Sequence, residues 1–289
     1  MDLPFRKYHG LGNDFIVVFA LDPLEPLDQL DAHAIELCDR HRGVGADGVL
    51  LVLPARGSGS QATMRVLNAD GSEPEMCGNG LRCVAAALAN HHAPLAGRAE
   101  LLIDTGAGAL RCLLFRDPGD DVNEVEVEMG QPSLERSDIG LEGDGRFVQE
   151  QIELDGSRSF VGTAVSMGNP HFVIFIDDPD EDLRQLALHF GPLLESHPLF
   201  ANRTNVEFAR IAAGEMELWV WERGCGLTQA CGTGACAAAV AAKVTERFVG
   251  HRQIVRLPGG KLDISVADDL SGVRMRGPAV EVYSGTITL

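Results

Sequence analysis

Apolar residues follow two different periods along this chain, and each period predicts one kind of element. Residues 124–129 alternate glutamate with valine or methionine, which is the pattern of a strand with one buried and one wet face. The segments 78–90 and 232–248 instead contain alanine-rich runs, 84–89 and 235–242, that are apolar at every position. Because a helix without a polar face is buried, these two segments are predicted to be central helices.

The same patterns, with glycine, proline and asparagine marking turns, place the other elements. Two further helices are predicted over 29–41, opened by Pro26 and Asp28, and over 178–190. Strands are predicted on both sides of a turn within 5–20, and over 49–53, 63–67, 99–103, 109–115, 122–129, 147–154, 159–166, 172–176, 206–212, 215–221, 253–257, 261–266, 272–276 and 279–287. Many strands and two buried helices predict an α+β fold with two similar lobes, each a curved sheet or barrel wrapped around one helix.

The starts of the two buried helices repeat one another. A shift of 154 positions aligns Cys77 with Cys231, and each cysteine is followed by Gly-x-Gly. Nine residues earlier a polar residue, Asn68 or Glu222, ends a predicted strand. Upstream, two more segments resemble each other: Gly12-Asn13 and Gly168-Asn169. The sequence therefore predicts a duplicated half-chain, with a boundary at the glycine- and proline-containing segment that begins at residue 130.

Length and charge narrow the class of protein. The chain has 289 residues and is 45% hydrophobic, which is enough for a large core and two domains. Its 24 basic and 42 acidic residues give a net charge of -18, which argues against nucleic acid or an anionic membrane as a partner. No apolar run approaches the about 20 residues of a membrane-spanning helix, and the first residues lack a signal-peptide pattern. A cytoplasmic location is the default expectation.

The chain has seven cysteines, and an odd number favours free thiols in a reducing compartment over a disulfide framework. Their spacing does not fit a zinc finger, so no metal site is expected. Inert packing accounts well for four of them and less well for a fifth: Cys38, Cys83, Cys112 and Cys236, and then Cys225. It accounts poorly for Cys77 and Cys231, because the glycines beside them have no purpose in inert packing.

A thiol at the start of a helix meets unpaired backbone N–H groups and a partial positive charge, which favour the thiolate. A redox pair is disfavoured because the sequence contains no Cys-x-x-Cys motif. Acid–base chemistry fits two equivalent thiols best: one removes the α-proton of an amino acid and the other returns a proton to the opposite face. The backbone N–H groups of the helix starts would face the substrate carboxylate, where charge develops: Gly78, Asn79, Gly232 and Thr233. No pyridoxal-lysine or nucleotide motif is apparent, so the expected site uses no cofactor.

Seven segments together resemble diaminopimelate epimerase, in that family's order and over nearly the whole chain: Gly10-Leu11-Gly12-Asn13-Asp14-Phe15, Asn68-Ala69-Asp70-Gly71-Ser72, Glu75-Met76-Cys77-Gly78-Asn79-Gly80, Gly168-Asn169-Pro170-His171, Thr204-Asn205-Val206-Glu207, Glu222-Arg223-Gly224 and Ala230-Cys231-Gly232-Thr233-Gly234-Ala235. The resemblance implies cofactor-free interconversion of LL- and meso-2,6-diaminopimelate, in lysine and peptidoglycan precursor synthesis. It also implies two pseudo-symmetric lobes, 1–130 and 131–277, with 278–289 returning to the first lobe.

The resemblance also implies roles for single residues. Cys77 and Cys231 would be the acid–base pair. Six further residues would hold the substrate, largely its non-reacting end: Asn13, Asn68, Asn169, Asn205, Glu222 and Arg223. His171 and Glu222 lie where the family tunes its thiols, and the planar guanidinium of Arg223 suits a distal carboxylate. Family members are usually homodimers, and Tyr283 matches a position at that interface.

Some positions depart from the family pattern, and other functions compete. Gly48 stands where many relatives carry glutamine, and Leu227 and Gln229 stand where acidic and aliphatic residues are common.

Proline racemase and 4-hydroxyproline epimerase are the nearest alternatives, but they resemble Met-Cys-Gly-His-Gly where this chain has Asn79, and their substrates do not require Arg223. Phenazine-type isomerases generally lack the two cysteines. A binding protein without catalysis would need the asparagines but not the paired thiols.

Overall fold

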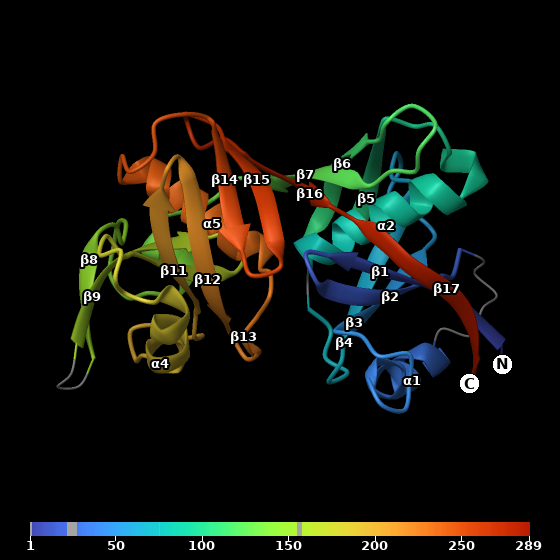
Figure 1. Ribbon diagram of the computed structural model, residues 1–289, viewed down its shortest axis with the longest axis horizontal. Coiled ribbons are helices and arrows are strands. Elements are labelled where there is room, and N and C mark those ends of the chain that lie inside the picture. The colour runs from blue at the N-terminus through green and yellow to red at the C-terminus, as the bar shows by residue number, and fades with distance from the viewer. Residues whose placement is uncertain (1, 22–27, 75, 155–157) are drawn as a thin grey trace. The chain divides into compact units, whose positions relative to one another are not determined.

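The computed structural model describes residues 2–21, 28–74, 76–154 and 158–289 (Figure 1). The chain divides into two compact units, residues 1–128 with 276–289 and residues 129–275. Two of the expected features, Pro26 as a helix opener and Glu75 within the first cysteine motif, lie outside the described residues. No helix among the described residues is long and apolar enough to span a membrane.

The described residues of the first unit form eight strands and three helical segments: β1 (Asp2–Gly10), β2 (Asn13–Phe19), α1 (Asp28–Cys38), β3 (Gly48–Leu53), β4 (Ala62–Asn68), α2 (Gly78–His91), the 3₁₀ helix η1 (Ala93–Leu95), β5 (Glu100–Thr105), β6 (Gly108–Phe115), β7 (Glu124–Gly130) and β17 (Val280–Thr288). β7 runs into the second unit at its end. The C-terminal strand β17 pairs antiparallel with β1, which places the last residues of the chain in this unit.

In the second unit, the part of the chain that the structure describes forms nine strands and three helices: α3 (Arg136–Ile139), β8 (Glu150–Leu154), β9 (Arg158–Ser166), β10 (Pro170–Phe175), α4 (Leu183–Glu195), β11 (Asn205–Ala212), β12 (Glu215–Glu222), β13 (Gly226–Leu227), α5 (Gly232–Val244), β14 (Arg252–Leu257), β15 (Gly260–Val266) and β16 (Val273–Pro278). β16 runs into the first unit at its end. An apolar cluster of the second unit is rich in phenylalanine, and Phe172 and Phe208 within it are fully buried.

Strand pairing follows the same order in both units. In the first unit β1 pairs antiparallel with β2, β2 parallel with β3, β3 antiparallel with β4, and β4 parallel with β5. In the second unit β9, β10, β11, β12 and β14 repeat that sequence of antiparallel and parallel pairs. The repeat detected in the sequence is therefore a repeat of topology.

One buried helix packs inside each unit. Residues 78–89 of α2 are all buried, and α2 contacts β1, β2, β3, β4, β6 and β17 (Figure 1). α5 is buried along most of its length and contacts β9, β10, β11, β12, β14 and β15. Alanine and glycine allow the strands to approach each helix from several sides, because they project little beyond the backbone. The predicted α+β fold of two similar units around central helices is confirmed.

Several predicted bounds were wrong. The helix expected over 178–190 begins at Leu183, because Asp182 caps it by accepting from the amides of Arg184 and Gln185, and it ends at Glu195. The strand expected from residue 147 begins at Glu150, after Gln149 with φ of 53°. The two helices expected to end at 41 and 248 stop earlier, at Cys38 and Val244. The short segments α3, η1 and β13 were not predicted.

Candidate active site

Cys77 is the N-cap residue of α2. Its backbone is extended, with φ −136° and ψ 107°, and its sulfur accepts a hydrogen bond from the amide of Gly80 at 3.3 Å. A Cβ on Gly80 would lie 2.9 Å from Cδ2 of Leu50, so glycine permits this close contact with β3. The cysteine thus performs the capping task that serine or aspartate usually performs at a helix start.

Cys231 has the same position at the start of α5. Its φ of −119° and ψ of 109° match those of Cys77, and its sulfur accepts from the amide of Gly234 at 3.4 Å. The hydroxyl of Thr233 lies 3.6 Å from the sulfur. A Cβ on Gly234 would lie 2.8 Å from Oε1 of Glu207, which comes from the strand corresponding to β3.

At Cys231 the surroundings oppose the acidification that is expected of a thiol at a helix start. Burial raises the pKa of this thiol well above its usual range, and the nearby carboxyls of Glu222 and Glu207 raise it further. The Thr233 hydroxyl and the Gly234 amide act in the opposite direction. The helix start alone therefore does not make Cys231 a thiolate, and its ionisation depends on what its neighbours donate to it.

Two of the predicted asparagines of the first unit, Asn13 and Asn79, are hydrogen-bonded to each other, and Asn13 is also bonded to an aspartate. Asn13 follows a tight turn in which Leu11 and Gly12 have positive φ, and its amide nitrogen donates to Asp47 at 2.7 Å. Its side-chain oxygen accepts from Asn79 at 3.1 Å. Asp47 also accepts from Arg40 at 2.7 Å. The structure therefore fixes Asn13 between Asp47, which lies just before β3, and Asn79 in the first turn of α2.

Asn68 ends β4, at the level of Gly48 on the neighbouring strand. Its amide nitrogen donates to the hydroxyl of Ser72 at 2.9 Å, and that hydroxyl donates to Asp70 at 2.6 Å. A Cβ on Gly48 would lie 2.7 Å from the carbonyl oxygen of Leu67. Gly48 thus permits close contact between β3 and β4, and no substrate role is assigned to it.

In the second unit a hydrogen-bonded row connects two buried residues with the start of α5. Nδ1 of His171 lies 2.7 Å from Oε1 of Glu207, and both side chains have no exposed surface. Nε2 of His171 lies 3.0 Å from Oδ1 of Asn169. The amide nitrogen of Asn169 donates to the Thr233 hydroxyl at 3.4 Å.

The other predicted residues of this unit meet around the end of β12. Glu222 accepts from the hydroxyl of Thr228 at 2.5 Å, and burial raises the pKa of its carboxyl. The backbone amide of Arg223 donates to Oδ1 of Asn205, whose own nitrogen donates to the carbonyl of Pro170 at 2.8 Å. The side chain of Arg223 is exposed and donates to the carbonyl of Asn202 at 3.1 Å.

Three residues that organise these groups were not assigned from the sequence: Asp47, Glu195 and Glu207. Glu195 accepts from the amide of Gly224 at 2.9 Å and from the indole of Trp221 at 2.8 Å, which fixes the loop that carries Arg223. Glu207 carried the strongest signal of the three, because an acidic residue stands inside an otherwise apolar strand start. That signal marks a buried carboxyl but does not identify its partner.

The remaining predictions have separate outcomes. Gly78, Asn79 and Gly232 are buried in the first turns of the two helices, as their positions implied. Cys38, Cys83, Cys112 and Cys236 are buried, whereas Cys225 is exposed and is not core packing. Leu227 packs against the apolar cluster of the second unit. Tyr283 lies on β17, 45% exposed, with its ring edge-on to Phe5.

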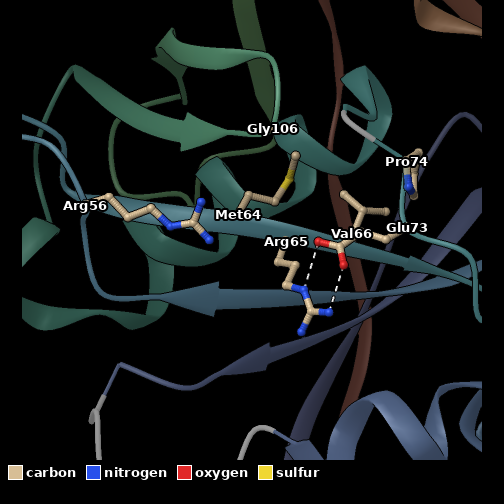
Figure 2. Close-up of a pocket in the computed structure, with 7 residues that line it drawn as sticks. All are labelled: Arg56, Met64, Arg65, Val66, Glu73, Pro74 and Gly106. Atoms are coloured by element: carbon tan, nitrogen blue, oxygen red, sulfur yellow. Dashed lines mark hydrogen bonds and ion pairs between the residues drawn. The ribbon is translucent and has the colours of Figure 1, made fainter.

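A hollow of about 200 Å³ lies elsewhere in the first unit. Figure 2 shows that it is lined by β4, by Gly106 and by the segment after Asn68, where Arg65 and Glu73 form an ion pair. None of the predicted site residues lines it. This ion pair connects β4 to the segment that leads to Cys77, at 2.7 Å.

Comparisons of sequence place the chain among known proteins. The family model described as Diaminopimelate epimerase matches residues 5–135 and 163–282. A diaminopimelate epimerase of Desulforudis audaxviator is 48% identical over 285 residues, covering 98% of both chains. Another, of Synechocystis, is 46% identical over 291 residues and covers 99% of both chains.

Comparisons of structure place the fold more broadly. A hydroxyproline epimerase from Agrobacterium vitis superposes with a TM-score of 0.70 at 16% identity, covering 99% of this chain and 91% of that one. A phenazine biosynthesis protein of Bacillus anthracis gives 0.67 at 16% identity, covering 100% of both chains. These identities show a shared fold only, whereas the matches in sequence cover nearly the full length at far higher identity. The chain therefore belongs to the diaminopimelate epimerase family.

Proposed function

We propose that this chain interconverts LL- and meso-2,6-diaminopimelate without a cofactor, in the synthesis of lysine and peptidoglycan precursors. The observation that carries the proposal is the pair of equivalent cysteines, Cys77 and Cys231, each capping a buried helix in a member of this family. An epimerase needs a base on one face of the stereocentre and an acid on the other. Two thiols of the same kind meet that need in both directions of the reaction.

In the proposed reaction one thiolate takes the α-proton and the other thiol delivers its proton to the opposite face. The C–H bond breaks on one side, a new C–H bond forms on the other, and the two cysteines exchange protonation states. Negative charge develops on the substrate carboxylate during transfer. Backbone N–H groups at the helix starts stabilise it there: those of Gly78, Asn79, Gly232 and Thr233.

Recognition of the non-reacting end follows from the polar groups fixed around each helix start. We assign Asn13, Asn68, Asn169, Asn205, Glu222 and Arg223 to it. The exposed guanidinium of Arg223 is the charged group that suits a distal carboxylate, since two parallel N–H donors bind one carboxylate bidentately. Glu222 and His171 are assigned to tuning the thiols, because Glu222 contacts Cys231 directly and His171 reaches it through Asn169 and Thr233.

Three further assignments belong to the same proposal. The two compact units serve as the two lobes of the family, with the C-terminal strand belonging to the first. A homodimer forms through the face that carries Tyr283, where an exposed aromatic ring stands on β17. The chain works in the cytoplasm, because the proposed chemistry requires two reduced thiols and that compartment keeps thiols reduced.

Proton NMR of LL-diaminopimelate with the purified, reduced protein in D₂O tests the activity. The proposal predicts loss of one of the two equivalent α-protons from each molecule that reacts, together with appearance of the meso isomer. 4-Hydroxyproline under the same conditions is the control, and its signals are expected to stay unchanged. Unchanged LL-diaminopimelate alongside epimerised 4-hydroxyproline would replace the proposed substrate with that of the alternative.

A further inference from the structure

We propose that Glu207 is a positioning residue for Cys231. Its buried carboxyl bonds Nδ1 of His171 so that Nε2 faces Asn169 with its hydrogen, and the hydrogen bonds that follow turn the hydroxyl of Thr233 toward the cysteine sulfur. The inference rests on the proposed role of Cys231 and deepens it, because it names what makes a buried thiol at this helix start ionisable.

The donors and acceptors in the row of hydrogen bonds from His171 to Cys231 follow from which atoms can donate. Oδ1 of Asn169 is a carbonyl oxygen and only accepts, so Nε2 of His171, 3.0 Å away, must carry a hydrogen. The amide nitrogen of Asn169 then donates to the Thr233 hydroxyl. That hydroxyl, having accepted from Asn169, has its own proton left for the sulfur of Cys231 at 3.6 Å. A hydroxyl donor stabilises a thiolate more than a thiol.

Glu207 determines this direction because it faces the other nitrogen of the ring. Because Nε2 already carries a hydrogen, the 2.7 Å contact between Nδ1 of His171 and Oε1 of Glu207 holds a second proton, either as imidazolium with carboxylate or as neutral ring with carboxylic acid. In both forms Nε2 keeps its hydrogen. Without the carboxyl, the ring can place its single proton on Nδ1, and the amide of Asn169 would then turn and withdraw the Thr233 proton from the sulfur.

The first unit offers an internal comparison. Phe15 pairs with Gly48 as His171 pairs with Asn205, and Leu50 lies against Gly80 as Glu207 lies against Gly234. The positions of the buried acid–imidazole pair thus hold two apolar residues beside Cys77. The shared fold therefore does not require two titratable groups at these positions, which argues against a purely structural role for them in the second unit.

Charged groups of three strands face Cys231 or its neighbours: Glu222 from β12, Glu207 from β11 and His171 from β10. The negative charge of a carboxylate disfavours a thiolate beside it. The charges of Glu222 and Glu207 accordingly raise the pKa of Cys231. Paired with His171, however, Glu207 forms a unit whose charges compensate each other. Its remaining effect on the cysteine is then the orientation of the donors.

Alkylation by iodoacetamide near neutral pH, followed cysteine by cysteine with peptide mass spectrometry, tests this directly. Glu207→Leu installs the residue of the first unit and is expected to slow alkylation of Cys231 about fivefold, the factor for one ordinary hydrogen bond. Thr233→Val removes the last donor and is expected to slow it equally. The double variant is expected to be no slower than Thr233→Val, because both changes remove the same interaction.

Cys77 in the same molecule is the internal reference, and its rate is expected to stay unchanged. Glu150→Leu, which removes a carboxylate paired with Arg136 on β8, is the control for loss of an acidic residue from this unit. Alkylation of the buried Cys83 and Cys236 would reveal unfolding. If Glu207→Leu unfolds, His171→Phe with Glu207→Leu supplies both residues of the first unit and is expected to give the same slowing.

A folded variant lacking Glu207 that alkylates Cys231 at the wild-type rate overturns the inference, as do additive effects in the double variant. These readouts need no substrate. Failure of the proposed epimerisation would appear in the NMR assay while the alkylation results stand, so the two failures are distinguishable.

Discussion

The backbone amide of Arg223 donates a hydrogen bond to Oδ1 of Asn205, 2.9 Å away. The nitrogen of the same asparagine donates to the carbonyl of Pro170, next to His171. Asn205 is buried, so this bond fixes the backbone from which the exposed guanidinium of Arg223 extends. Because its backbone is held in place, the Arg223 guanidinium suits recognition of a carboxylate that lies at a fixed distance from the reacting carbon.

Arg223→Ala is therefore expected to raise KM for diaminopimelate by about tenfold to a hundredfold, the range for losing hydrogen bonds to a charged group. A monocarboxylate analogue is expected to lose far less. Steady-state kinetics on both compounds measure the difference. Arg146→Ala, which removes an exposed arginine paired with Glu135, is the matched control. Equal losses on both compounds would remove the assigned role of Arg223.

Cys77→Ser and Cys231→Ser are each expected to lower kcat by about a thousandfold, within the range for loss of a general acid or base. A serine hydroxyl keeps the cap on the helix amide but is a much weaker acid and base. Cys225→Ser changes the exposed cysteine of the loop after β12 and is expected to retain wild-type turnover. Near-normal turnover by either of the first two variants would contradict the two-base scheme.

Gly234→Ala is expected to destabilise the protein by about 1–3 kcal/mol, the cost of overpacking a buried site. Its Cβ would lie 2.8 Å from Oε1 of Glu207 and 3.2 Å from the sulfur of Cys231. Gly272→Ala is the control, since nothing lies within 4 Å of a Cβ there. Urea unfolding measures both free energies of unfolding, and an equal, small loss in the two variants would show that the contact is not tight.

Glu222 predicts a dependence of stability on pH. Burial raises the pKa of its carboxyl in the folded state, so the folded protein holds this proton more tightly than the unfolded chain. Its contribution to the free energy of unfolding therefore falls as pH rises above about 4.3, the unfolded value, and through the folded pKa.

Glu222→Gln keeps an oxygen that accepts from Thr228 and removes the ionisation. Relative to wild type, the variant is expected to gain stability at neutral pH and to differ little near pH 4. Urea unfolding at the two pH values measures this. If Glu222→Gln instead loses stability relative to wild type at neutral pH but not at pH 4, Glu222 favours folding as a charged group.

The sequence predicted those parts of the fold and site that short segments determine. The alanine-rich helices and the Cys-Gly-x-Gly starts are local patterns, and they identified α2, α5 and both caps. The pairs His171–Glu207 and Asn13–Asp47 were missed, because each depends on the register between strands that only the folded sheet establishes. The start of α4 was misplaced because several acidic residues precede it and only Asp182 forms the cap.

The most direct test of the two-base scheme is the deuterium content of both isomers early in the reaction of LL-diaminopimelate in D₂O. With two thiols on opposite faces, the delivered atom comes from the second thiol, which exchanges with solvent. The scheme predicts one solvent deuterium in each new meso molecule and none in the remaining LL isomer. Meso product that retains the substrate's own hydrogen at the inverted α-carbon, or LL substrate that gains deuterium as fast as product forms, would contradict it.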